Sequence, residues 1–107
     1  MKQRLLPIGT IVKLYEKDRL MMICGYCPMN PERVGYVYDY SGFVYPEGYR
    51  DAKKIYVFDN TDIEETIAMG YQDKETLAYV SVLEKKIDMI KQVAANKAME
   101  KEEKADV

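Results

Sequence analysis

The sequence contains no histidine and no tryptophan, and the missing histidine excludes several kinds of chemistry. Without an imidazole, the protein cannot use histidine as a general acid or base, or pair it with a serine or cysteine nucleophile. Imidazole metal ligands are excluded for the same reason. The sequence also lacks the glycine-rich nucleotide-binding motifs and the paired-histidine zinc motif. We therefore expect a protein that is not an enzyme and that holds no metal and no cofactor.

Cysteine is scarce, and the two that are present, Cys24 and Cys27, have the C-x-x-C spacing of a redox dithiol. Such dithiols react because a helix N-terminus lowers the pKa of one thiol. Here the pair ends an apolar run and precedes Pro28, so that environment is missing. A zinc site would need four ligands of the Cys or His kind. Packing is the favoured interpretation, and a dithiol oxidoreductase remains an alternative.

An excess of charge is also absent, since 16 Lys and Arg balance 18 Asp and Glu to give a net charge of −2. Nucleic-acid binders usually have a strongly basic face, so we expect no nucleic-acid partner. The longest apolar run, residues 20–27, is far shorter than the ~20 residues needed to cross a bilayer. No signal peptide is readable at the start of the chain. A chain of 107 residues predicts a single domain, which we expect to be cytoplasmic and not inserted in a membrane.

Glycine and proline occur only before residue 71, which divides the chain into two parts. In the first part, runs rich in β-branched and aromatic residues alternate with turn residues, as in antiparallel strands. We expect strands over residues 10–15, 20–26, 34–40, 43–45 and 54–58. They predict an α+β fold with a small curved antiparallel sheet or partly open barrel of about five strands.

The expected sheet is followed by helical signals. Thr61 and Glu64 have the spacing of a capping box, and Gly70 is placed to end a helix, so we expect a short helix over residues 61–70. Asp73 is a candidate N-cap for a longer helix. We thus divide the chain into a β-rich domain over residues 1–73 that ends in the short helix, a C-terminal amphipathic helix of the same domain over residues 74–98, and a charged, disordered tail over residues 99–107.

The long helix has a wider apolar face than one contact requires. One stripe includes Leu83, Ile87 and Ile90, and a neighbouring stripe consists of Tyr79, Val82, Met89 and Val93, with Lys86 among them. Burial of the whole face against the protein's own sheet is the favoured interpretation. The alternative is a second contact, either with another copy, giving a homodimer through this helix, or with a different protein. We take Leu83, Ile87 and Ile90 as candidate partner-binding residues.

Tyrosine is unusually frequent, with 10 in the chain, most of them between residues 26 and 56. Tyrosine offers a large contact area at a low cost in side-chain entropy, which suits protein recognition. The alternative is that these residues pack within the sheet with their hydroxyls near solvent. A platform for single-stranded nucleic acid would need a basic groove, which this region lacks. The candidate partner-binding tyrosines are Tyr36, Tyr38, Tyr40, Tyr45 and Tyr49.

Four ordered segments, residues 6–12, 36–42, 44–48 and 58–73, resemble a known family. They are similar to the small domain-of-unknown-function proteins encoded in type VII secretion loci of Firmicutes, which resemble the EsaE-type chaperone of a secreted toxin. Because Pro-Glu-Gly is an ordinary turn, the matching positions are read as fold-forming rather than partner-binding. Besides the tyrosines already named, they are Pro7, Gly9, Asp39, Gly42, Pro46, Glu47 and Gly48.

The resemblance implies a non-catalytic accessory protein that binds a polymorphic toxin of the LXG class, encoded nearby, as a dedicated export chaperone or targeting factor. Other secretion-targeting factors are possible further partners. The cysteine pair is not part of the family pattern. An immunity protein that neutralises the toxin is the alternative function, and an acidic pI near 5.2 would suit a nuclease toxin as the target.

Overall fold

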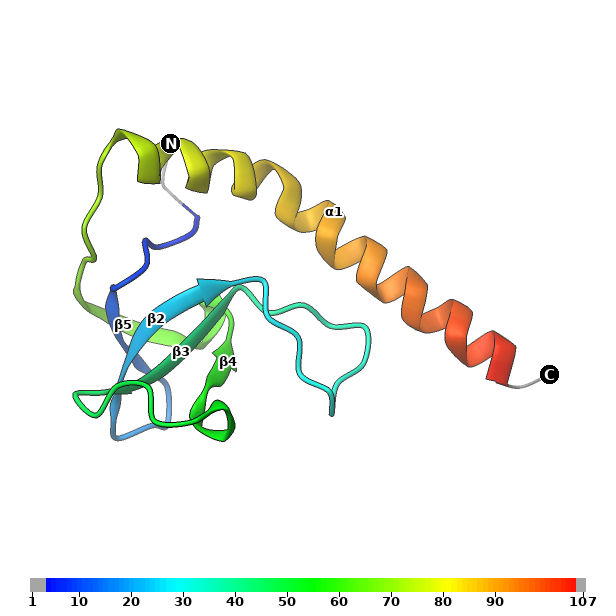
Figure 1. Ribbon diagram of the computed structural model, residues 1–107, viewed down its shortest axis with the longest axis horizontal. Coiled ribbons are helices and arrows are strands. Elements are labelled where there is room, and N and C mark those ends of the chain that lie inside the picture. Colours follow the sequence, from blue (N-terminus) through cyan, green and yellow to red (C-terminus); the bar gives the residue numbers. More distant parts are fainter. Residues whose placement is uncertain (1–3, 106–107) are drawn as a thin grey trace.

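The computed structural model describes residues 4–105, with side chains described through residue 100. Five antiparallel strands form one open sheet in the order β4-β3-β2-β1-β5, and one long helix, α1, runs across one end of it (Figure 1). This confirms the predicted α+β fold. The elements are β1 (Ile11–Leu14), β2 (Leu20–Tyr26), β3 (Tyr40–Tyr45), β4 (Tyr56–Phe58), β5 (Ile63–Ala68), α1 (Lys74–Ala105) and two 3-10 turns at Ala52–Lys54 and Asn60–Asp62.

The core lies between one face of the sheet, α1 and the segment that precedes β1. Alternate residues of the strands point to this face, as the two-residue period of a strand requires. Val80 and Ile87, which lie two turns apart on the same face of α1, cover them. The buried hydrophobic cluster consists of Leu5, Val12, Leu14, Met21, Ile23, Tyr40, Phe58, Val80 and Ile87.

The segment before β1 links the helix to the sheet. The Leu5 amide donates a hydrogen bond of 2.7 Å to Glu84 on α1, and the Leu6 amide donates one of 2.9 Å to the hydroxyl of Tyr40 on β3. Arg4 forms an ion pair of 3.0 Å with Asp88. The polar side of α1 is thus held by the N-terminal segment.

The start of α1 agrees with the capping signal in the sequence. The carboxylate of Asp73 accepts hydrogen bonds from the amide and the hydroxyl of Thr76 at 2.8 and 2.9 Å. The helix continues to Ala105, past the expected end at residue 98, so residues 99–105 of the expected tail are helical. Residues 106 and 107 of that tail lie outside the described part. Within residues 4–105, no helix is both long enough and apolar enough to span a membrane.

The expected short helix over residues 61–70 is wrong. The capping box forms between Asp59 and Asp62 and closes only a 3-10 turn, after which the chain extends as β5. Strand β5 pairs with the edge of β1, with Val12 opposite Thr66. Gly70 does not cap a helix, because its backbone passes so close to Ile8 that a Cβ there would lie 2.2 Å from the Ile8 carbonyl oxygen. Pairing with β1 outweighs the local helical signal.

The expected strand over residues 34–40 is also wrong. Residues 34–39 belong to the β2–β3 connection, where a bridge joins Met29 and Val37, and only Tyr40 lies in a strand, as the first residue of β3. Gly35 has a φ of +83°, which interrupts an extended chain. The alternation of aromatic and small residues therefore fits packing against α1 rather than strand pairing.

Candidate protein-docking surface

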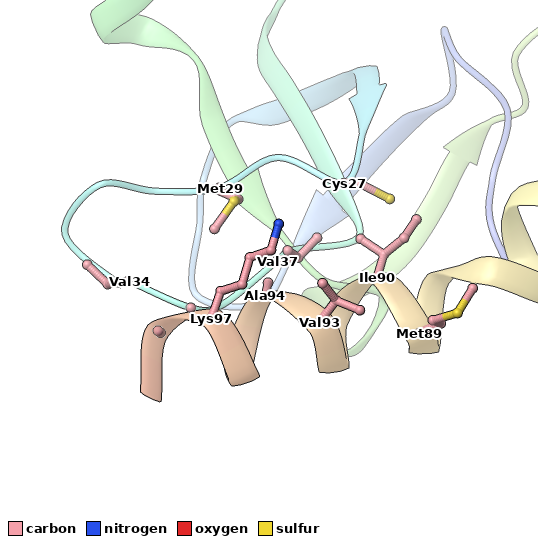
Figure 2. A pocket seen from close by; sticks show the side chains of 11 residues that line it. Cys27, Met29, Val34, Val37, Met89, Ile90, Val93, Ala94 and Lys97 are labelled. Carbon is pink, nitrogen blue, oxygen red and sulfur yellow. The ribbon is translucent and has the colours of Figure 1, made fainter. Parts of the chain in front are cut away.

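The C-terminal half of α1 and the β2–β3 connection enclose an apolar groove of about 520 Å³. Figure 2 shows Ile90, Val93 and Ala94 of the helix facing Val37 and Met29 of the connection. Among the described residues, Lys97 is the only charged one that lines the groove, and its side chain reaches toward the connection. The remaining lining residues are Cys27, Val34, Gly35, Met89 and Ala98.

An ion pair holds the connection against the helix beside the groove. Asp39, which is 4% exposed, accepts a hydrogen bond of 2.8 Å from the ammonium of Lys91 on α1. Its other carboxylate oxygen accepts one of 2.9 Å from the amide of Asn60. The Lys91 ammonium also lies 3.9 Å from Asp59. One helical cation therefore ties α1 to two loops at the same end of the sheet.

The connection is stiffened by an aromatic and cationic stack. The Arg33 guanidinium lies 3.6 Å from the ring centroid of Tyr36 and 5.7 Å from that of Tyr38. The Tyr36 hydroxyl donates a hydrogen bond to Asp59, and this bond, followed by partial burial, raises the pKa of Tyr36 to about 12. Tyr36 and Tyr38, both candidate partner-binding residues, thus fix the shape of the connection.

Gly35 sets how closely the connection approaches α1. A Cβ at Gly35 would lie 2.5 Å from the Cβ of Ala98, and 3.5 Å from the carbonyl oxygen of Ala94. Small residues on both sides let the backbone of the connection touch the helix. This contact closes the end of the groove nearest the C-terminus of α1.

A stripe of exposed apolar side chains continues from the groove along α1. It consists of Tyr79, Val82, Met89 and Val93, and we call it the α1 stripe. Tyr79 is 62% exposed and Met89 is 60% exposed. Met89 and Val93 also line the groove, while Tyr79 lines a second hollow at the start of the helix with Ile8 and Tyr71. Apolar side chains therefore extend from one hollow to the other, interrupted by the exposed Lys86 between Val82 and Met89.

Two of the candidate partner-binding residues are core residues. Tyr40 and Ile87 are each 0% exposed. The Tyr40 hydroxyl accepts from the Leu6 amide and donates to Asn60, and burial raises the pKa of Tyr40. These two side chains are therefore unavailable to a partner in this structure. The sequence could not separate them from exposed neighbours, because Tyr36, Tyr38 and Tyr40 alternate along one segment and Ile87 has the same helical spacing as Leu83 and Ile90.

The other candidates fall on separate surfaces. Leu83 is half-buried against the core, and Ile90 lines the groove. Tyr45 ends β3 and Tyr49 lies in the β3–β4 connection, and both side chains are exposed. This connection is at the end of the sheet away from α1 (Figure 1). The structure therefore does not bring the tyrosines together on one recognition face.

Groove residues of the β2–β3 connection were missed by the sequence analysis, among them Met29, Val34 and Val37. They were assigned to a loop and a strand, and their approach to α1 depends on contacts that are distant in sequence. The helical wall of the groove, by contrast, was indicated in the sequence by the second apolar stripe of α1.

The family-pattern residues have structural roles. Pro7 and Asp39 are buried, and Gly9 has a φ of +89°. Gly42 lies where a Cβ would be 2.7 Å from the Met22 carbonyl oxygen. In the turn after β3, Pro46 follows a cis peptide bond. Glu47 forms an ion pair with Arg19, and the Gly48 amide donates a hydrogen bond to the Val44 carbonyl oxygen.

The two cysteines have different surroundings. Cys24 is exposed and its thiol lies 3.7 Å from the Ser41 hydroxyl, whereas Cys27 lines the groove. Burial, followed by the nearby Asp39 carboxylate, raises the pKa of the Cys27 thiol. A raised pKa disfavours the thiolate on which dithiol chemistry depends. In the described part of the chain, no three His, Cys, Asp or Glu side chains are grouped so as to hold a metal ion.

The sequence pattern of the family described as "Domain of unknown function (DUF4176)" matches residues 5–79, more than half of the chain, so the chain belongs to this family. Neither the comparison with curated proteins nor the comparison with solved structures yields a match. The match covers the whole sheet and the first turns of α1. It ends before the helical residues that line the groove.

Proposed function

We propose that the protein is a non-catalytic accessory protein of type VII secretion that binds an LXG-class toxin as an export chaperone or targeting factor. The observation that carries the proposal is the apolar groove between α1 and the β2–β3 connection, together with the α1 stripe. The type VII context comes from the resemblance of residues 6–12, 36–42, 44–48 and 58–73 to proteins of those loci.

The character of the surface supports protein binding. Soluble monomers rarely expose large continuous apolar patches, so a patch of this kind marks an interaction site. The groove is bounded mainly by apolar side chains, and Lys97 is the one charged residue among its described lining. An extended surface of this composition suits a segment of another protein.

The walls of the groove are held in place before a partner arrives. The Asp39–Lys91 pair and the close contact between Gly35 and Ala98 fix the connection relative to the helix. A surface that is already ordered loses little conformational entropy on binding. This preorganisation favours a dedicated binding partner.

Co-expression with the large toxin candidate encoded beside the protein tests the proposal. Affinity purification of the tagged protein followed by light scattering should give a complex of defined stoichiometry. Separate elution of the two folded proteins would contradict the proposal.

Deletion of the gene distinguishes a chaperone from an immunity protein. If the protein is an export chaperone, deletion abolishes secretion of the toxin and leaves the producing cell viable. If the protein instead neutralises the toxin, deletion poisons the producer while export continues.

A further inference from the structure

We propose that the α1 stripe docks an amphipathic helix of the toxin whose apolar seam is flanked by acidic residues. This inference rests on the proposed function and names the kind of segment that the surface would bind. It is carried by the spacing of the exposed residues on α1 and by the charges beside them.

The exposed residues have the spacing of a helix–helix seam. Tyr79, Val82, Lys86, Met89 and Val93 follow one another at intervals of three, four, three and four residues. This is the heptad spacing by which one helix offers a continuous seam to another. All five side chains are exposed, whereas Val80 and Ile87 on the neighbouring face are buried. The helix therefore uses one face for its own core and leaves a second, parallel seam uncovered.

The length of the surface suits a helix of several turns. At a rise of 1.5 Å per residue, the stretch from Tyr79 to Lys97 extends about 27 Å, or five turns. The hollow lined by Tyr71 and Tyr79 lies at one end, and the groove beside Val93 lies at the other. The β2–β3 connection would then contact the end of the docked helix.

Between Tyr79 and Lys97 the charges beside the seam are positive, although the whole chain has a net charge of −2 and Asp73 and Glu75 line the hollow before Tyr79. Lys85, Lys86 and Lys97 are exposed, and among the side chains that the structure describes none of them forms an ion pair. The two acidic residues of the same stretch, Glu84 and Asp88, are bound by the N-terminal segment on the other side of the helix. Charge complementarity therefore favours a partner with acidic flanks.

A second copy of the chain fits this seam poorly. In a parallel pairing Lys86 would face Lys86 of the other copy. Lys86 is also the midpoint between Tyr79 and Val93, so the antiparallel pairing with full overlap brings the same two residues together. Like charges placed opposite each other in a seam oppose association. A different protein is thus the better occupant.

Charge reversal on the seam tests the inference with the co-expressed toxin as the probe. The triple variant Lys85→Glu/Lys86→Glu/Lys97→Glu should bind the toxin more than tenfold more weakly than the wild type. The matched control, Lys17→Glu/Lys53→Glu/Lys54→Glu, makes the same change in net charge at exposed residues away from α1 and should bind within twofold of the wild type. Circular dichroism checks that both variants are folded.

A neutral variant and a crosslink make the test independent of charge. Val82→Ser/Met89→Ser should weaken binding, and a photo-reactive residue at position 82 or 89 should crosslink to a toxin peptide with an apolar seam and acidic flanks. If the wild type binds the toxin but the seam variants bind equally well, the inference is wrong and the proposed function stands. Crosslinking to a second copy, or to a toxin segment without this pattern, also overturns it. If the wild type does not bind the toxin, the proposed function fails, and the inference fails with it.

Discussion

The ammonium of Lys91 on α1 lies 2.8 Å from the buried carboxylate of Asp39, which precedes β3. The pair joins the helix to the sheet at the place where the β2–β3 connection forms one wall of the groove. Because the partners are 52 residues apart in sequence, the contact exists only in the folded chain. The groove therefore depends on a polar contact as much as on its apolar lining.

Loss of the Lys91 ammonium should destabilise the fold. Lys91→Met leaves Asp39 buried without its cation, which we expect to lower the free energy of unfolding by about 2 kcal/mol, less than for a fully buried pair because Lys91 is partly exposed. Denaturant unfolding measures this change. Lys85→Met, an exposed lysine on the same helix, is the matched control and should change stability little. Equal stability of the two variants would contradict the role of the pair.

Gly35 should tolerate a side chain worse than Gly48 does. Both have positive φ, at +83° and +77°, but a Cβ at Gly48 meets no atom within 4 Å. Gly48→Ala should therefore cost about 1 kcal/mol from backbone strain alone. Gly35→Ala should cost about 1–2 kcal/mol more, because its Cβ would overlap that of Ala98.

A double variant separates the overlap from the strain at Gly35. Ala98→Gly removes the atom that the new Cβ would meet, so Gly35→Ala should be less damaging in the Ala98→Gly background than in the wild type. Denaturant unfolding of the four proteins gives this coupling energy. A coupling of zero would mean that the connection does not rest on Ala98.

Ionisation of three partly or fully buried tyrosines should destabilise the folded protein at alkaline pH. The pKa is raised to about 12 for Tyr26, mainly by burial, and to about 12 for Tyr36, mainly by its bond to Asp59; burial also raises the pKa of Tyr40. In the unfolded chain these groups ionise near pH 10. The stabilisation is therefore complete below about pH 10 and is lost as the pH rises through 12.

Ultraviolet titration of the phenolate measures this shift directly. In the folded protein a fraction of the absorbance change should appear only near pH 12 or above, whereas in denaturant all tyrosines should titrate together. Tyr36→Phe should reduce the late fraction. Superimposable curves for the folded and unfolded protein would refute the prediction.

The two cysteines should react at different rates. Cys24 is exposed, whereas Cys27 is partly buried and its pKa is raised, so at neutral pH iodoacetamide should modify Cys24 first. Peptide mass spectrometry over time measures both rates, and Cys27→Ser should leave the rate at Cys24 unchanged. Equal rates would contradict the prediction, and a disulfide between the two residues would restore the redox interpretation.

Segments whose conformation depends on neighbouring residues could be predicted from the sequence, and segments whose conformation depends on distant contacts could not. Residues 20–26 and the cap at Asp73 were predicted correctly, because their signals are complete within a few neighbouring residues. The segments 34–40 and 61–70 were not, because their conformations depend on α1 and on β1 respectively. Of the site, the apolar helix face was visible in the sequence, and the opposing wall was not.

The most direct test of the account is the affinity for the toxin when the groove and the α1 stripe are altered together. Met89→Glu/Val93→Glu changes two exposed residues that line the groove, and Tyr45→Glu/Tyr49→Glu changes two exposed residues at the other end of the sheet. Isothermal titration should give a more than tenfold weaker affinity for the first variant and an unchanged affinity for the second. Unchanged binding by the first variant, with loss of binding by the second, would contradict the account and place the partner on the tyrosines.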